Sequence, residues 1–272
     1  MMPIWIALLL GAVQGFSEFL PISSSGHLAL LQNLLNFNQY GADAVTFDLV
    51  LHLGTLVAVI IAFWKDVKEI VVEFFKWVAD GFKLRNRPSR RLLLMLILGT
   101  LPLVAGALLE NYISAAFENP IFIGIALMFT AVLLWCADRF GGGNKNARTA
   151  KLSDGLKVGL MQLVALFPGI SRSGSTICGG LFCKFDRDFA VRFAFLLSIP
   201  AVLGATVFKL PDLESAALAE NLAPYAAGFI TAAVCGYLAI ALVRTLMKKG
   251  SFRYFAVYCA VVGLLAVILS IA

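Results

Sequence analysis

The sequence predicts an all-α integral membrane protein with six transmembrane helices and two re-entrant helical hairpins in an inverted-topology repeat. Three observations lead to this prediction. The chain of 272 residues is 60% hydrophobic and only 14% charged, which is far from the composition of soluble domains. Its basic residues are clustered between apolar runs, and a segment of the first half, 11–27, aligns without a gap with a segment of the second, 159–175. These features predict, in turn, the spans, their orientation and the hairpins.

Several apolar runs approach the roughly 20 residues that a helix needs to cross the hydrocarbon core of a bilayer. The clearest runs are 92–109, 121–137, 189–208, 225–243 and 255–271. The first ten residues are apolar too, but no basic segment precedes them and no small-residue cleavage site follows, so we expect them in the mature protein. The five cysteines have neither CxxC nor His-paired metal spacing, which indicates packing residues.

The basic residues predict the topology. Of the 22 Lys and Arg residues, eight lie in 65–91, five in 138–157, three in 184–192 and four in 244–253. The connections 28–45, 110–119 and 209–224 contain acids, among them Asp43, Glu118, Asp212 and Glu214, and one base, Lys209. By the positive-inside rule the first set is cytoplasmic. Because both flanks of 156–183 are basic, this segment is expected to enter from the cytoplasm and return to it as a re-entrant hairpin.

An internal repeat agrees with this topology. A shift of 148 positions aligns GAVQGFSEFLPISSSGH at 11–27 with GLMQLVALFPGISRSGS at 159–175. Each copy would be one hairpin followed by three crossings, and an odd number of crossings gives the copies opposite orientation. We therefore expect a first repeat over 1–140, a cytoplasmic connector over 141–155 with a flexible GGGNKN string, and a second, inverted repeat over 156–272. The segment 65–83 has apolar residues at helical spacing between charges, which predicts an interfacial amphipathic helix.

Polar and charged residues inside the two hairpins make them the candidate site. An ionisable group inside a bilayer costs about 2.5–3.5 kcal/mol on insertion scales, so it indicates function by default. Glu18 and Arg172 are the most conspicuous, and the alternative is a structural salt bridge between the repeats. The copies differ where chemistry is expected: Ser24 aligns with Arg172 and Glu18 with Leu166. A second alternative, helix kinks packed by small residues, would also account for the serines and glycines.

The residue types suit phosphoryl transfer. A guanidinium binds two phosphate oxygens at once, and backbone amides in glycine-containing turns add donors. A carboxylate in the same cluster can bind a divalent cation through its hard oxygen atoms. A histidine can transfer protons near neutral pH or act as a nucleophile. Taken singly, His27 would more often be a core histidine with satisfied hydrogen bonds.

The strings QGFSEFLPISSSGH at 14–27 and PGISRSGST at 168–176 resemble the two signatures of the bacitracin-resistance type of undecaprenyl-diphosphate phosphatases. Length, hydropathy and spacing agree as well, so the resemblance covers essentially the whole chain. It implies hydrolysis of undecaprenyl diphosphate to the monophosphate carrier of cell-wall synthesis. It also implies a divalent cation, Mg²⁺ or Ca²⁺, and a multi-pass protein of the bacterial cytoplasmic membrane with a site open to the outer face.

The resemblance also assigns roles to residues. Glu18 is implied in metal binding or acid–base support, Ser24 and His27 at the reacting centre, and Arg172 in holding the pyrophosphate. Among the nucleophile candidates we rank His27 slightly above Ser24, with water third. Many relatives have a glutamate where this chain has Gln14, so a metal site with two carboxylates is in doubt, and His52, which matches no signature position, is interpreted as structural. The expected substrate-binding residues are Gln14, Ser23, Ser25, Ser171, Ser173, Gly174 and Thr176.

The expected partners are a polyprenyl diphosphate lipid and membrane lipids, with a homodimer left open. Nucleic acid is not expected, because the net charge of +6 is explained by topology. The other function class that remains open is a polyprenyl-phosphate lipid transporter or flippase, since inverted repeats with interrupted helices are familiar from transporters. Phosphate release in detergent, without a transmembrane gradient, would distinguish the phosphatase from the transporter.

Overall fold

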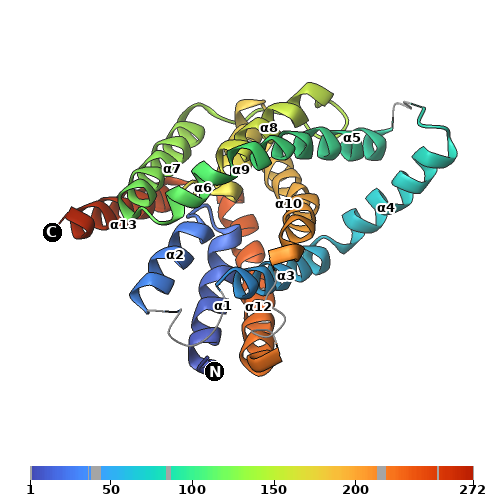
Figure 1. Ribbon diagram of the computed structural model, residues 1–272. Coiled ribbons are helices and arrows are strands. Elements are labelled where there is room, and N and C mark those ends of the chain that lie inside the picture. The colour runs from blue at the N-terminus through green and yellow to red at the C-terminus, as the bar shows by residue number, and fades with distance from the viewer. Residues whose placement is uncertain are drawn as a thin grey trace.

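The structure is a computed structural model that describes residues 2–35, 37, 44–83, 87–212, 219–249 and 251–271. These described residues form a bundle of helices (Figure 1). Six helical segments are long and apolar enough to cross a membrane, which confirms the predicted number of spans. Asp43, Arg85 and Glu214, which contributed to the charge pattern, lie outside the described residues. The six segments are Ala44–Ala62 (α3), Pro88–Phe117 (α5, η2 and α6), Pro120–Phe140 (α7), Arg187–Lys209 (α10), Leu222–Met247 (within α12, Leu222–Lys249) and Arg253–Ile271 (α13).

Two prolines mark irregular places in these spans. The second span changes from α-helix in α5, Pro88–Thr100, to a 3₁₀-helix in η2, Leu101–Leu109, and Pro102 lies at the start of η2. Proline lacks the amide hydrogen that the α-helix needs at that point, so the change of hydrogen-bonding pattern follows from it. The span then ends in the short α6, Glu110–Phe117. Pro200 lies inside α10, and the short η3, Leu210–Asp212, follows that helix.

Two pairs of short helices lie among the spans (Figure 1). The first pair is α1, Ile4–Phe19, and α2, Ser24–Leu34, and the second is α8, Leu152–Val164, and α9, Arg172–Phe182. These pairs occupy the two segments in which hairpins were predicted. Each is a helix, a sharp turn and a second helix, and the turns are the two Ser- and Gly-containing strings of the sequence.

Each short pair packs against a span from the other half of the chain. Helix α1 lies along α12, and α8 lies along α5 (Figure 1). Glycines permit both crossings: a Cβ on Gly11 would come 2.6 Å from the carbonyl oxygen of Gly228, and one on Gly159 would collide with that of Gly99. Gly11 and Gly159 are partners in the internal sequence match. The two halves are therefore interlocked by the same kind of close helix contact.

Side chains of α7 and α13 hold the two turns in place. The hydroxyl of Thr130 in α7 donates to the carbonyl oxygen of Gly169 at 3.0 Å and accepts from the amide of Ser171 at 3.1 Å. The thiol of Cys259 in α13 donates to the carbonyl oxygen of Pro21 at 3.6 Å. Because Pro21 and Gly169 also correspond in the internal match, both turns are supported at the same position by a helix of the bundle.

The connector between the halves differs from the prediction of a flexible string. The amide of Gly142 donates to the carbonyl oxygen of Leu181 at 2.8 Å, and that of Gly143 donates to Phe185 at 3.0 Å. Lys145 exchanges backbone hydrogen bonds with the segment that follows α9. The glycines of this string let the chain run against the end of the second hairpin, where it is held by its backbone.

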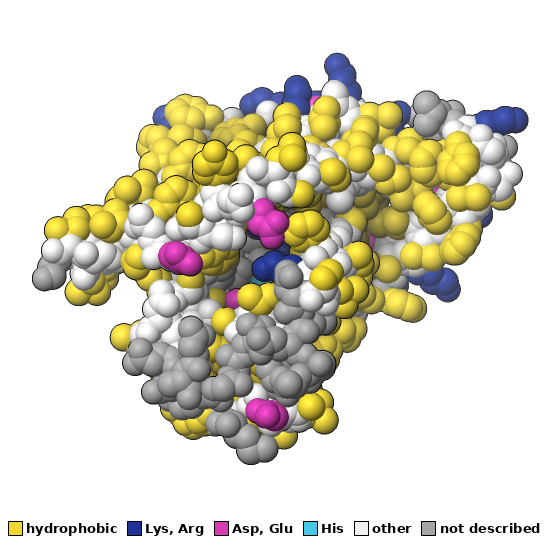
Figure 2. Space-filling model, in the orientation of Figure 1, with side chains coloured by type: hydrophobic (Ala, Val, Ile, Leu, Met, Phe, Trp, Pro, Cys, Tyr) yellow, Lys and Arg dark blue, Asp and Glu magenta, His cyan; other side chains and the backbone are white. Residues whose placement is uncertain are grey.

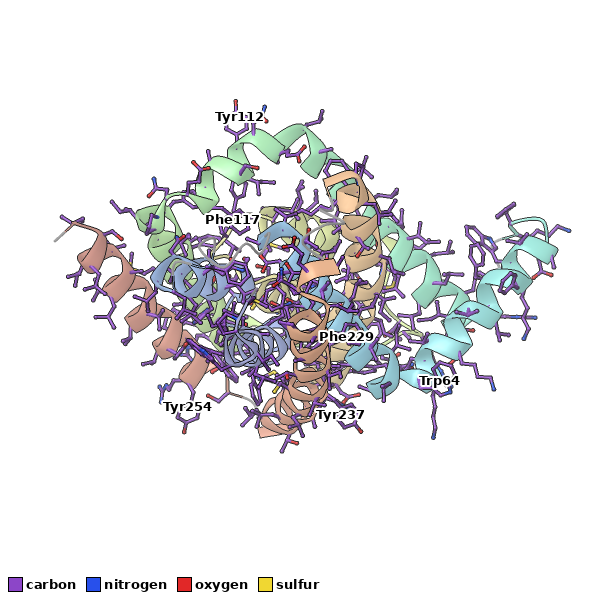
Figure 3. The ribbon with its side chains drawn as sticks, turned by 60° about the horizontal axis from the view of Figure 1, so that its bottom comes forward. Trp64, Tyr112, Phe117, Phe229, Tyr237 and Tyr254 are labelled. Atoms are coloured by element: carbon purple, nitrogen blue, oxygen red, sulfur yellow. The ribbon has the colours of Figure 1, made fainter. Side chains whose placement is uncertain are left out.

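Helix α4, Trp64–Ala79, has the amphipathic character that its sequence predicts, with apolar side chains exposed along much of its length. Figure 3 shows Trp64 at its start pointing away from the bundle. The far end of α4 is bound to α5 by Arg90, which is fully buried. The Nε atom of Arg90 donates to Glu73 at 2.6 Å, and its Nη2 atom donates to Asp80 at 3.2 Å. This buried ion cluster fixes the α4–α5 corner.

The visible surface carries many of its basic side chains along one edge. Figure 2 shows Lys and Arg side chains gathered along the upper edge and the right-hand side, above and beside a broad apolar surface. Tyr112 and Tyr254 point outward at the periphery (Figure 3), and their exposed fractions are 70% and 76%. Aromatic residues with a polar end are typical of membrane–water interfaces. These features, together with the six apolar helices, fit a multi-pass membrane protein.

Candidate functional site

The centre of the candidate site is the carboxylate of Glu18, near the end of α1. The Oε2 atom accepts hydrogen bonds from the Ser24 hydroxyl at 2.7 Å and from Nε2 of Gln14 at 3.1 Å. The Oε1 atom accepts one from a guanidinium nitrogen of Arg172, which belongs to the other hairpin. The Glu18 side chain is only 4% exposed, so these donors replace water. The structure thus brings together four of the sequence-predicted residues around one buried acid.

Both turns lead into a helix that is capped by serine. Ser23 is the N-cap of α2 and accepts from the amide of Gly26 at 3.4 Å, and Ser171 is the N-cap of α9 and accepts from Gly174 at 3.1 Å. Capping leaves the other amides of the first helical turn without an intrahelical acceptor. The positive ends of two helix dipoles therefore begin at the turns that hold Glu18 and Arg172. Such helix starts favour an anion.

The two caps differ in backbone conformation. Ser23 has φ +72°, a left-handed conformation that is unfavourable for a residue with a side chain, whereas its counterpart Ser171 has φ −67°. Residues held in such regions cost about 1–3 kcal/mol and occur at functional sites. Nδ1 of His27 donates to the carbonyl oxygen of Ser23 at 2.7 Å. This hydrogen bond stabilises the turn immediately before Ser24.

The ring of His27 does not contact Glu18. Its Nδ1 atom is bound to Ser23, and its Nε2 atom lies 2.8 Å from the hydroxyl of Tyr258 in α13, on which the ring is stacked. A backbone carbonyl only accepts, so Nδ1 carries the hydrogen and the Tyr258 hydroxyl donates to Nε2. Both ring nitrogens thus have hydrogen-bond partners, Ser23 in the first turn and Tyr258 in α13. Nothing in the sequence indicated that Tyr258 belongs to the site.

The hydroxyls of the second signature are mostly bound to backbone. Ser173 donates to the carbonyl oxygen of Leu20 at 3.0 Å, which ties the start of α9 to the first turn. Thr176 donates to the carbonyl oxygen of Arg172 at 2.9 Å within its own helix. These hydroxyls are buried, whereas Ser24 and Ser25 are half-buried. The accessible hydroxyls of the site belong to the first hairpin.

His52 belongs to the cluster, which the sequence did not predict. It lies in α3, and its Nε2 atom is 3.8 Å from Oε2 of Glu18. Its Nδ1 atom donates to the carbonyl oxygen of Asp48 at 2.7 Å, and its side chain is 32% exposed. Nothing in the sequence indicated that His52 lies beside Glu18, and its interpretation as structural stays a prediction. The face in Figure 2 has a hollow in which acidic, basic and histidine side chains are visible among apolar ones.

The donors around Glu18 fit one divalent cation that shares its coordination with a substrate. No group of three His, Cys, Asp or Glu side chains that could hold a metal occurs among the described residues. The Oε1 atom of Gln14 is buried without a hydrogen-bond partner, beside a carboxylate and a hydroxyl. Mg²⁺ commonly binds through one or two carboxylates and the phosphate oxygens of the substrate. A single carboxylate with neutral oxygen donors is sufficient for that mode.

Comparison with known sequences supports the resemblance that the two strings indicated. The sequence model of the family described as Bacitracin resistance protein BacA matches residues 7–265. The chain belongs to this family. A protein of Methanosphaera stadtmanae named undecaprenyl-diphosphatase is 41% identical, with 100% of this chain and 99% of the relative covered. Relatives of the same name include one of Halothermothrix orenii, 39% identical over 99% of both chains, and undecaprenyl-diphosphatase 1 of Shouchella clausii, 40% identical over 96% of this chain and 95% of the relative.

Membership in the BacA family confirms the resemblance that the two strings indicated. The chain's matches to the relatives run nearly end to end, so the short helix pairs and all six candidate spans lie within the shared part. The Glu18–Arg172 contact joins the two strings. The contact itself is also compatible with the alternative of a structural salt bridge. A salt bridge alone, however, would not require the half-buried Ser24 or the two helix starts beside it.

Proposed function

We propose that this protein hydrolyses undecaprenyl diphosphate to undecaprenyl phosphate and inorganic phosphate, and so recycles the lipid carrier of cell-wall synthesis. The observation that carries the proposal is the meeting of the two family strings at Glu18, which contacts Gln14, Ser24 and Arg172. These groups supply an acid, a hydroxyl and a guanidinium within one buried cluster. The relatives that match over their whole length are named for the same activity.

Arg172 binds the diphosphate in this proposal. Its side chain is 20% exposed, so the guanidinium is open to a ligand while it contacts Glu18. A guanidinium presents two parallel donors to a pair of phosphate oxygens. The first-turn amides of α2 and α9 add donors from the two helix starts. The terminal phosphate then lies between the two turns, and the polyprenyl chain remains in the lipid.

Ser24 is the nucleophile that the contacts favour. Its hydroxyl donates to Glu18 at 2.7 Å, so the carboxylate is placed to take the proton as the oxygen attacks phosphorus. The bond from the terminal phosphorus to the bridging oxygen breaks, and undecaprenyl phosphate leaves. Glu18 gives the proton that it took from Ser24 to the leaving oxygen of undecaprenyl phosphate and is a carboxylate again. Water then attacks the phosphoserine and gives a proton to Glu18, the bond from phosphorus to the Ser24 oxygen breaks, Glu18 returns the proton to that oxygen, and inorganic phosphate is released. This order reverses the ranking from the sequence, which placed His27 first.

His27 is assigned a positioning role. Nδ1 donates to the Ser23 carbonyl, and the lone pair of Nε2 accepts from the Tyr258 hydroxyl, so it is not directed at the cluster. The bond to Ser23 supports the left-handed turn from which Ser24 projects. The ring therefore acts on the proposed nucleophile, Ser24, indirectly, through the backbone of the preceding Ser23.

A divalent cation, Mg²⁺ or Ca²⁺, completes the proposed site. Glu18 would hold it, and the unpartnered Oε1 atom of Gln14 would add a second oxygen. When bound, it would neutralise the negative charge of the diphosphate oxygens. Arg172 shares that task from the opposite turn, and Ser24 remains within reach of the carboxylate.

We also propose that the two short pairs are re-entrant hairpins of an inverted repeat. The longest of their helices, α1, has 16 residues and spans about 24 Å, less than the ~30 Å of the hydrocarbon core. The crossings of α1 on α12 and of α8 on α5 support the repeat. The hollow among acidic side chains in Figure 2, away from the basic upper edge, supports a site that opens to the outer face. A homodimer stays a prediction.

Phosphate release from undecaprenyl diphosphate by purified protein tests the function. We expect turnover in detergent that a chelator abolishes, and loss of turnover in Ser24→Ala. The matched control is Ser153→Ala, which removes an exposed hydroxyl at the start of α8 and should leave turnover unchanged. Absence of phosphate release from folded parent protein would refute the proposal.

The transporter remains the second candidate, because interrupted helices that meet inside a bundle are typical of transporters. The two functions are separated by proteoliposomes without a gradient. A phosphatase releases phosphate from substrate in the accessible leaflet, whereas a transporter moves the lipid between leaflets and leaves the diphosphate intact. Movement of intact diphosphate without phosphate release would favour the transporter.

A further inference from the structure

The position of His52 relative to Glu18 points beyond the roles that the family strings suggest. His52 comes from α3, outside both strings, and its Nε2 atom faces the Oε2 atom of the acid at 3.8 Å. It is 32% exposed, so a small solute can reach the ring. The chain has only two histidines, and the other, His27, faces Tyr258.

The hydrogen bond of His52 determines which nitrogen is available. Nδ1 lies 2.7 Å from the carbonyl oxygen of Asp48, which can only accept, so Nδ1 carries the hydrogen in the neutral ring. Nε2 then keeps its lone pair, and no described residue makes a hydrogen bond to it. Histidines that bind metals typically donate the other ring nitrogen to a carbonyl or carboxylate in this way. The ring is thus oriented as a ligand before any cation binds.

The distances suit a cation shared by His52 and Glu18. Two ligand atoms that each bind one cation at about 2.0–2.2 Å can be at most about 4.3 Å apart. The separation of 3.8 Å between Nε2 of His52 and Oε2 of Glu18 lies within that limit. The Ser24 hydroxyl, 2.7 Å from the same oxygen, adds a neutral oxygen donor. Nε2 of Gln14 donates to that oxygen at 3.1 Å, and Oε1 of the same amide is buried without a hydrogen-bond partner and is a second neutral oxygen.

We propose that His52 is a nitrogen ligand of the divalent cation at Glu18, so that the site is mixed in nitrogen and oxygen. The inference rests on the cation of the proposed function and deepens it. Imidazole suits first-row transition ions, whereas Mg²⁺ and Ca²⁺ prefer oxygen. The parent therefore binds Mn²⁺ more tightly than Mg²⁺, and His52→Gln reduces this preference because the amide supplies only an oxygen or a non-basic nitrogen.

Pulsed electron paramagnetic resonance of bound Mn²⁺ tests the proposal directly, because it detects an imidazole nitrogen on the ion. The protein is purified without a histidine tag and loaded with Mn²⁺ alone. We expect ¹⁴N coupling in the parent, loss of that coupling in His52→Gln, and its retention in His27→Gln. Since the chain has no third histidine, these two variants assign the signal completely. Titration should also show that His52→Gln weakens Mn²⁺ binding at least roughly tenfold, comparable to losses at other metal sites.

Two results would overturn the inference: no ¹⁴N coupling in the Mn²⁺-loaded parent, or coupling that survives His52→Gln. The parent spectrum alone is decisive if His52→Gln does not fold. Failure of the inference is distinguishable from failure of the proposed function. Mg²⁺-dependent phosphate release without ¹⁴N coupling leaves the phosphatase and removes His52 as a ligand. Coupling without phosphate release leaves the cation site and removes the phosphatase.

Discussion

Replacement of Arg172 by lysine separates phosphate binding from structural charge pairing. In the structure the guanidinium contacts Glu18, whose side chain is 4% exposed, while Arg172 itself is 20% exposed. A lysine keeps the positive charge that this buried carboxylate needs, so thermal unfolding should stay close to that of the parent. It loses the planar fork that holds two phosphate oxygens.

The expected effect on catalysis is large. Loss of one preorganised donor aimed at developing charge costs roughly a hundredfold or more in turnover, about 2.7–4 kcal/mol. The contrast with Arg172→Ala is informative, because that change leaves Glu18 as an uncompensated buried charge. Breaking a buried pair from one side costs about 3–5 kcal/mol of folding stability, somewhat less here because Arg172 is partly exposed. Only the alanine variant should therefore lose stability.

The assay is phosphate release in detergent together with thermal unfolding of the same preparations. Arg187→Lys is the matched control: this arginine is 33% exposed and lies 3.6 Å from Asp138 at the basic face, where a lysine serves equally well. We expect the control to match the parent in both measurements. If Arg172→Lys turns over substrate like the parent, the fork has no role and Arg172 is a structural partner of Glu18.

Three further predictions follow from the contacts. Glu18→Gln should abolish chelator-sensitive phosphate release, because it removes the one carboxylate of the cluster, and near-normal turnover with unchanged cation dependence would contradict the assigned role. Tyr258→Phe keeps the ring stacked on His27 but removes a donor worth about 1 kcal/mol, so kcat should fall roughly fivefold, and an unchanged kcat would remove Tyr258 from the site. In intact cells, a cysteine beside Glu118 should react with an external impermeant thiol reagent and one beside Arg187 should not; labelling beside Arg187 would contradict the second re-entrant hairpin.

Much of the fold could be predicted from the sequence, because the hydropathy of a span is a local quantity. Five of the apolar runs were identified directly, and the sixth span, Ala44–Ala62, was expected only from the count of three crossings in each repeat. Two pairs of short helices lie in the segments in which hairpins were predicted, because the internal match placed both turns at the same offset. The connector was mispredicted as flexible because glycine indicates turns and mobility equally, and its pairing with Leu181 and Phe185 depends on the end of α9.

The site could be predicted only where its residues lie in the two strings. Glu18, Ser24 and Arg172 were found together because polar residues are unexpected in apolar segments. His52 and Tyr258 come from spans with no distinctive string around them, and only the packing of α3 and α13 brings them near the turns. The orientation of His27 was not predictable either, because the ring is held toward α13 by the hydrogen bond from Tyr258, a tertiary contact 231 positions along the chain.

The unequal division of charges between the hairpins has a physical reason in the structure. Leu166, which corresponds to Glu18, is half-buried and packs against Gly106 in the apolar η2, where a carboxylate would have an apolar neighbour in place of a hydrogen-bond donor. The acid is therefore tolerated in one hairpin alone, and the guanidinium that neutralises it comes from the other. The polar cluster of the first hairpin alone would carry the unpaired negative charge of Glu18, and that of the second the positive charge of Arg172. Burial of Glu18 therefore requires contact between the two turns. The residues of the candidate site at this junction are brought together by the same interlocking of the two halves that buries the apolar core.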